Sequence, residues 1–334
     1  LPGVSQEAVP FRKERADGHL SGHACGHHLF GTGIVSAAIE VKNWMQNNKI
    51  KGTLRIHGTP AEEGGSGKIY MAREGLFDDV DMSMYWHAGN QNSVRVASNL
   101  AIASVKYRFK GISTHAAGAP ERGRSALDGV EVMNYMMNMM REHIPSASRI
   151  HYVITKGGEA PNVVPAHAEV YYFFRHPDIR VVKDLLDRSI KAAEGAAMGT
   201  GTSMTYEMTG GSFNILPNKI LSEVVHANLE MVGGVDYTEA EHLFAETLMT
   251  TFNSEGLSPE MAASVAPFSA SEIAGNYSTD AGDVSWIVPL VSMSAATWPT
   301  GTPGHSWQAV AAGGTSMGIK GMTVAAKTMA MTAI

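Results

Sequence analysis

The chain has 334 residues and a net charge of −6, with 44% hydrophobic and 17% charged residues. That length is sufficient for two domains, and these proportions are those of an ordinary globular protein. The acidic balance and the lack of a run rich in Lys or Arg argue against nucleic acid as a partner. No apolar run reaches the 18 residues of a membrane-spanning helix, so we expect no membrane partner.

Cys25 is the only cysteine, so the chain has no internal disulfide and does not depend on an oxidising compartment. We therefore expect a cytoplasmic protein. The sequence opens on LPGVSQEAVP without an initiator Met and stops inside a helical Ala/Met-rich stretch. We expect from this that it is a fragment, truncated at both ends.

The first hundred residues alternate between helical and strand patterns. Apolar residues at helical spacing predict a helix over 31–47. TLRIHG at 53–58 predicts a strand, and a Gly-rich loop follows it. A helix over 68–77 and an apolar strand over 80–89 come next. The order strand, helix, strand favours a parallel sheet covered by helices.

The pattern changes near residue 98. Strands and helices now follow in the order βαββαβ, which is typical of a small ferredoxin-like domain. Helical patterns then resume, and a buried strand is predicted over 288–297. We therefore predict an α/β fold with two domains. Residues 1–97 and 214–334 form a catalytic domain with a mainly parallel sheet flanked by helices. Residues 98–213 form a ferredoxin-like domain inserted into it. Within the insertion, strands are predicted at 103–111, 149–158, 167–177 and 203–211, and helices at 125–143 and 180–201.

Two short segments contain residue types that bind metals. GHACGHH holds Cys25 and His27, whose thiolate and imidazole suit Zn²⁺ and related ions. Glu62 and Glu63 follow the predicted strand at 53–58, and because neighbouring side chains diverge, one can ligate a metal while the other reaches a water. Each segment alone is better explained without function, as a buried cysteine near surface histidines and as a solvated acidic loop.

Two further histidines lie where parallel strands are predicted to end. His87 closes the strand over 80–89, and His305 lies on a Gly/Pro loop beyond the strand over 288–297. Functional groups of parallel sheets gather at this edge. Either histidine alone is better read as structural, but the conjunction of one Cys, one acidic pair and three His outside the insertion predicts a site for two metals.

The chain also resembles a known family. The stretches GHACGHHLFGTG, GTPAEEGGSGKIYM, STDAGDVSW and GTPGHSWQ are similar to those of the metal-dependent amidohydrolases and exopeptidases that include aminoacylases, hippurate hydrolases and glutamate carboxypeptidases. The resemblance implies that Cys25 bridges two divalent metal ions, Zn²⁺ or Mn²⁺. It implies that Glu62 is the general base and that the remaining ligands are His27, Glu63, His87 and His305.

The inserted domain resembles the lid and dimerisation domain of the same family. His115, in an STHA motif, is then expected to reach the site of the partner subunit and stabilise an oxyanion. Asn162 and Arg175 are expected to bind substrate, and Arg175 is expected to pair with a carboxylate of that substrate. The alternatives are a turn residue for His115 and a surface strand residue for Arg175. The resemblance implies a homodimer formed through this domain.

The implied reaction is hydrolysis of an N-acyl or N-aroyl amino acid, with p-aminobenzoyl-glutamate as the expected substrate and another N-acyl amino acid or a dipeptide as the alternative. A second hydrolase subunit is a further possible partner. Two rival functions remain at this point: a hydrolase with Cys25 as nucleophile, and a non-catalytic binding or assembly subunit. Asp280 and Asp283 are candidates to orient a ligand histidine or to cap a helix.

Overall fold

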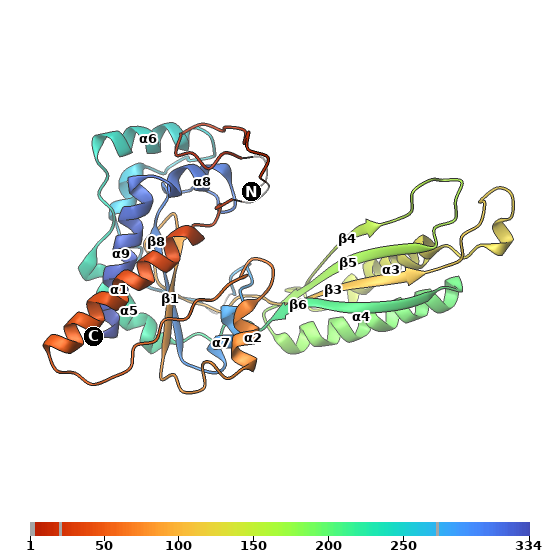
Figure 1. Ribbon diagram of the computed structural model, residues 1–334, viewed down its shortest axis with the longest axis horizontal. Helices are drawn as coiled ribbons and strands as arrows, with labels where there is room; N and C mark the ends of the chain where they lie inside the picture. The colour runs from red at the N-terminus through yellow and green to blue at the C-terminus, as the bar shows by residue number, and fades with distance from the viewer. Residues whose placement is uncertain (1–3, 20–21, 272–273) are drawn as a thin grey trace.

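The computed structural model describes residues 4–19, 22–271 and 274–334. The chain forms two lobes, of which the larger holds both ends of the chain and the smaller extends away from it (Figure 1). The helices and strands of the larger lobe are α1 (His27–Asn47), α2 (Gly67–Arg73), β1 (Ser83–Gly89), β2 (Arg95–Val96), α5 (Lys219–Val232), α6 (Glu239–Met249), β7 (Ser269–Ala270), α7 (Ala281–Ser285), β8 (Leu290–Ala296), α8 (Trp307–Gly313) and α9 (Ser316–Ala333).

The larger lobe is built on parallel strand pairs. β1 pairs with β8 in register from Ser83–Leu290 to Gly89–Ala296, and the short β2 pairs with β7. α1 and α9 pack together beside β1 and β8. α1 buries Leu29, Gly33, Ala37 and Val41, four residues apart each time, because this spacing places them on one helix face. The parallel, helix-covered arrangement confirms the predicted fold class.

One predicted strand of this lobe is wrong. Residues 53–58 form no strand, and Leu54 and Ile56 are exposed. Their alternation is that of a strand, but a strand requires a neighbour with a free hydrogen-bonding edge. In the part of the chain that the structure describes, β1 pairs with β8 and its other edge has no partner strand, but a cavity of about 490 Å³ lies between residues 53–57 and the α1–β1 layer, so these residues do not reach that edge. The loop carrying Glu62 and Glu63 therefore follows irregular chain, not a strand.

The smaller lobe has the order β3, α3, β4, β5, α4, β6, as predicted. Its antiparallel sheet has the strand order β4-β5-β3-β6. Val170, Tyr172 and Phe174 of β5 are fully buried against the two helices, whereas the alternate residues face the open side of the sheet. The bounds are β3 Ala101–Lys110, α3 Ala126–Met140, β4 Arg149–Lys156, β5 His167–His176, α4 Ile179–Thr200 and β6 Ser203–Ser212; short 3-10 helices lie at Pro120–Arg122, Arg141–His143 and, in the larger lobe, Pro259–Ala263.

The two lobes are joined by close backbone contacts around α7. The carboxylate of Asp283 accepts a hydrogen bond from the amide of Phe213 (3.0 Å), just after β6. Gly282 lies so near that a Cβ there would come within 2.0 Å of the Phe213 carbonyl oxygen, so only glycine fits. This hinge sets where the smaller lobe, which we call the lid, leaves the larger one. The lid boundaries at 98 and 213 stay predictions.

Candidate metal centre

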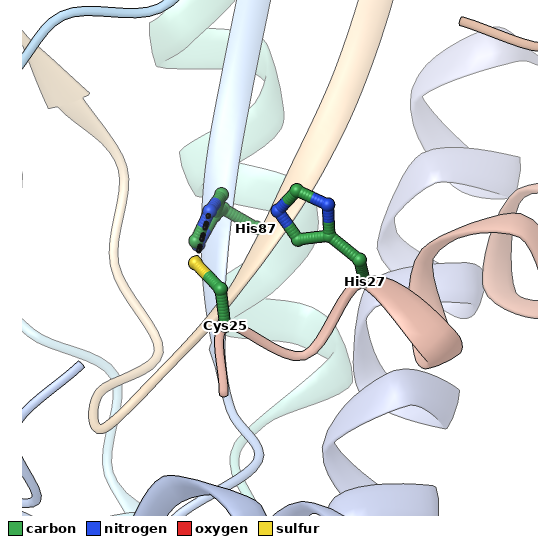
Figure 2. A group of neighbouring side chains, drawn as sticks. All are labelled: Cys25, His27 and His87. Atoms are coloured by element: carbon green, nitrogen blue, oxygen red, sulfur yellow. Dashed lines mark hydrogen bonds between the residues drawn. The ribbon is translucent and has the colours of Figure 1, made fainter. Parts of the chain in front are cut away.

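Cys25 and His27 flank a glycine turn at the start of α1. Gly26 adopts φ 79°, a left-handed conformation that suits glycine, and a Cβ there would lie 2.3 Å from the Cβ of Ala88. The turn thus brings the chain against the end of β1. Figure 2 shows the result: Cys25, on the loop, and His27, the first residue of α1, both face His87 on β1.

His87 is held in one tautomer by its own strand. Its Nδ1 lies 2.7 Å from the carbonyl oxygen of Ala88, so Nδ1 carries the hydrogen and Nε2 has a free lone pair. That Nε2 lies 3.4 Å from the Cys25 Sγ. Burial lowers the pKa of His87 and keeps the imidazole neutral. A neutral imidazole with its second nitrogen anchored to an acceptor is the form that ligates metals.

The acidic loop and His305 complete the group. The carboxylate of Glu63 lies 3.0 Å from Nε2 of His305 and 3.6 Å from Nε2 of His27. Glu62 lies 3.9 Å from the same His27 nitrogen. Ala61 (φ 60°) and His305 (φ 56°) adopt left-handed conformations, which cost energy for residues other than glycine. Strain of this kind is found where a site holds side chains in a required position.

These residues fit divalent metals by their donor atoms. Three overlapping groups have ligand atoms within 4.8 Å of one another. The Nε2 of His27 is buried and has no hydrogen-bond partner among the residues that the structure describes, as is expected of a nitrogen aimed at a cation. Sulfur, nitrogen and carboxylate oxygen together suit Zn²⁺ or a similar ion. The groups are Cys25, His27 and His87; Cys25, Glu63 and His305; and His27, Glu62 and Glu63.

Cys25 is a weak acid in this environment. Burial, together with the nearby Glu63 and Glu62, raises the pKa of its thiol to about 12. A thiolate at neutral pH thus requires positive charge beside it, and a metal ion supplies that charge. Cys25, like His27 and Glu63, belongs to two of the three ligand groups.

Asp280 and Asp283 do not orient a histidine of this site, so that suggestion was wrong. Asp280 is almost fully buried and accepts hydrogen bonds from the amide and the Nζ of Lys68 (2.9 and 2.8 Å). It lies at the N-cap position of α7, yet its side chain caps no amide of that helix. It links α2, which follows the acidic loop, to α7 at the hinge. Lys68 was not among the predicted site residues, because no sequence pattern joins it to a carboxylate 212 residues away.

His115 and Asn162 lie together at the far end of the lid. The amide of Ala116 donates to the carbonyl oxygen of Asn162 (2.9 Å), which holds the two loops side by side. The Nδ1 of His115 accepts from the amides of Ala117 and Gly118 (3.2 and 3.0 Å), so its Nε2 carries the hydrogen. The loops β3–α3 and β4–β5 that carry these residues point away from the larger lobe (Figure 1).

Arg175 lies at the opposite end of β5, next to the larger lobe. Asn162 precedes the first residue of β5, whereas Arg175 is near its last. A strand of this length spans roughly 25–30 Å at about 3.3 Å per residue, so the two residues lie far apart. The Nη1 of Arg175 donates to Ser278 (3.2 Å) in the loop before α7, and its Nε is buried and has no hydrogen-bond partner in the described part of the chain. Burial alone lowers the pKa of this guanidinium. One chain therefore places Arg175 against the larger lobe, and His115 and Asn162 on loops at the far end of the lid.

Comparison with known proteins shows the family of this chain. Residues 98–198 match a family described as peptidase dimerisation domain. The chain is 39% identical to the B component of p-aminobenzoyl-glutamate hydrolase from Escherichia coli K12, over all of this chain and 74% of that protein. The chain belongs to the M20 family of metal-dependent hydrolases.

Further relatives match this chain at lower identity. Human Xaa-Arg dipeptidase is 30% identical over 64% of this chain, which spans about half the length of that relative. Two solved structures share the fold: a dinuclear metal binding M20 peptidase from Bacillus subtilis (TM-score 0.60, 16% identity, 100% of this chain and 77% of that one) and an aminobenzoyl-glutamate utilization protein from Klebsiella pneumoniae (TM-score 0.59, 20% identity, 89% and 66%).

Proposed function

We propose that this chain, as part of the complete M20 enzyme, hydrolyses p-aminobenzoyl-glutamate to p-aminobenzoate and glutamate with two bound divalent metal ions. The observation that carries the proposal is the group of Cys25, His27, Glu63, His87 and His305 with Glu62 beside it. The relative from Escherichia coli, whose name states that substrate, supports its identity. Another N-acyl amino acid or a dipeptide is the alternative substrate, as the name of the human dipeptidase suggests.

In this proposal Cys25, His27, Glu63, His87 and His305 would hold the two ions, and Cys25 would be the ligand that both share. Bound metal ions supply Lewis acidity and lower the pKa of water. Both Zn²⁺ and Mn²⁺ suit the donor set, with the thiolate favouring Zn²⁺.

Glu62 has the position of a general base. It lies farther from His27 than Glu63 does, and it makes no contact with His305 of the kind that Glu63 makes. Its carboxylate is therefore free to take a proton from the attacking water and return it to the leaving amine. Arg175 holds a carboxylate of the substrate, since its cationic group is half-buried without an acidic partner among the described residues.

His115 and Asn162 act in the partner's site of a homodimer. The loops that carry them, β3–α3 and β4–β5, lie at the end of the lid away from the larger lobe (Figure 1), and this supports the assignment. The match to a peptidase dimerisation domain supports a dimer formed through the lid. With its hydrogen on Nε2, His115 donates to the oxyanion that forms at the amide carbonyl. A second hydrolase component fits the names of the relatives, which describe p-aminobenzoyl-glutamate hydrolase as a protein of two kinds of chain.

The contact between Cys25 and His87 gives a second candidate, a cysteine nucleophile activated by histidine. The environment disfavours it, because burial and two carboxylates raise the thiol pKa to about 12, whereas a nucleophilic cysteine needs a lowered one. Nor does it use Glu63 or His305.

No helix among the described residues is long and apolar enough to cross a membrane. A cytoplasmic location for the enzyme remains part of the proposal.

The deciding experiment measures metal content by mass spectrometry and glutamate release from p-aminobenzoyl-glutamate, before and after chelation. We expect two metals per chain and release that chelation abolishes. Two metals without release would move the proposal to another N-acyl amino acid. A folded protein that was never chelated and holds no metal would refute it.

A further inference from the structure

Two arginines face each other at the hinge end of the lid sheet. Arg149 of β4 and Arg175 of β5 are direct partners in the antiparallel register. Their neighbours Ile150 and Phe174 are buried under the helices, so by alternation both arginines lie on the open face of the sheet. Directly opposed side chains have Cβ atoms about 5 Å apart, and like charges in this relation are destabilising.

Neither guanidinium is compensated by an acid. Among the described residues, no carboxylate forms an ion pair with Arg149 or Arg175, although other lid arginines such as Arg108 and Arg180 do have such partners. Within the same part of the chain, Arg149 bonds backbone carbonyls through Nη1, those of Ser146 (2.9 Å) and Ser148 (2.8 Å). Its Nε and Nη2 are thus available to a ligand.

Both arginines act electrostatically on the same neighbouring side chain. His151 follows on the same face, opposite Phe173, and its pKa is lowered by burial and then by the charges of Arg175, Arg141 and Arg149. A like-charged pair that is retained without counter-charge is the arrangement of an anion site, since a bound anion removes the repulsion.

We propose that Arg149 binds the side-chain carboxylate of a dicarboxylic amino-acid leaving group, while Arg175 binds its α-carboxylate. This assignment rests on the proposed function and deepens it. Arg149 would be a specificity-determining residue: it selects glutamyl substrates over neutral ones. The pair of guanidiniums on adjacent strands suits two carboxylates of one small molecule better than a single carboxylate, because each can make its own bidentate contact.

The test compares kcat/KM for p-aminobenzoyl-glutamate and p-aminobenzoyl-glutamine in the metal-loaded, full-length enzyme. The glutamine compound has the same shape with a neutral amide in place of the side-chain carboxylate. We expect Arg149→Gln to lower kcat/KM for the glutamate compound by about 10–100-fold and to leave the glutamine compound within about twofold. Arg149→Lys should restore part of the loss. Arg180→Gln, an exposed arginine paired with Asp178, is the matched control and should change neither value.

Calorimetric binding of N-acetyl-glutamate and N-acetyl-glutamine separates this inference from the proposed function. We expect the unmodified protein to prefer the glutamate ligand and Arg149→Gln to bind both equally. Lack of preference in the unmodified protein, or an equal loss for both ligands in the variant, overturns the role of Arg149 whatever the enzyme hydrolyses. If the protein prefers N-acetyl-glutamate in binding but does not hydrolyse p-aminobenzoyl-glutamate, the role of Arg149 stands and only the proposed substrate is overturned.

Discussion

The two adjacent carboxylates of the acidic loop should respond to substitution in opposite ways. Glu63 lies 3.0 Å from His305 and 3.6 Å from His27, whereas Glu62 approaches only His27, at 3.9 Å. We therefore expect Glu62→Gln to keep both metals and to lose turnover, and Glu63→Gln to lose metal. Both changes preserve side-chain size, so they test charge and not packing.

The magnitude follows from the chemistry assigned to each residue. Removing a positioned general base lowers kcat by about 10²–10⁴-fold, which corresponds to about 3–5 kcal/mol in the activation barrier. Glu63→Gln removes a charged ligand that two of the ligand groups share, so its main effect should be on metal affinity.

Metal content by mass spectrometry and glutamate release by chromatography should be measured on the same preparations. Glu74→Gln, which changes an exposed glutamate just after α2, controls for the general effect of losing one surface charge. Metal loss in Glu62→Gln together with metal retention in Glu63→Gln would show that base and ligand are exchanged. Full turnover in Glu62→Gln would remove the general base from the mechanism.

The dimer, the hinge and the thiol each give one more prediction. Mixing His115→Ala and Glu62→Ala subunits should restore about a quarter of the activity, since half of randomly mixed dimers are heterodimers and each has one complete site; no recovery in verified heterodimers would refute action across the interface. Burial raises the pKa of Asp283 to about 6, so its contribution to stability is present below about pH 4 and is lost as pH rises through 6. Asp283→Asn should raise the free energy of unfolding at pH 8 by roughly 1–2 kcal/mol and leave it unchanged at pH 4, as denaturant titration would show; a gain of the same size at both pH values would contradict this. With a pKa of about 12, Cys25 in chelated protein should react with iodoacetamide at pH 8 on the order of 100-fold more slowly than a free thiol; the free-thiol rate would refute the burial argument.

Local patterns predicted the lid well for a physical reason. Its sheet is half-buried, so period-two alternation is strong in β5, where Val170, Tyr172 and Phe174 are covered and their neighbours are not. Its helices bury one face each, as Val182, Leu185 and Ala192 of α4 illustrate. The same rule failed at 53–58, because alternation reflects which side chains prefer burial and not whether the segment comes within hydrogen-bonding reach of a strand edge.

Residue identity and local periodicity were enough to predict the order of elements in the lid and to indicate which residue types can bind metal, including the two adjacent carboxylates Glu62 and Glu63. Only the tertiary structure decided which of these residues contact one another. Asp280 contacts Lys68 and not a histidine, Arg149 faces Arg175 across two strands, and His115 lies with Asn162 far from the metal group of its own chain. Such contacts depend on strand register and on how the hinge directs the lid, and both are set by interactions between residues remote in the chain.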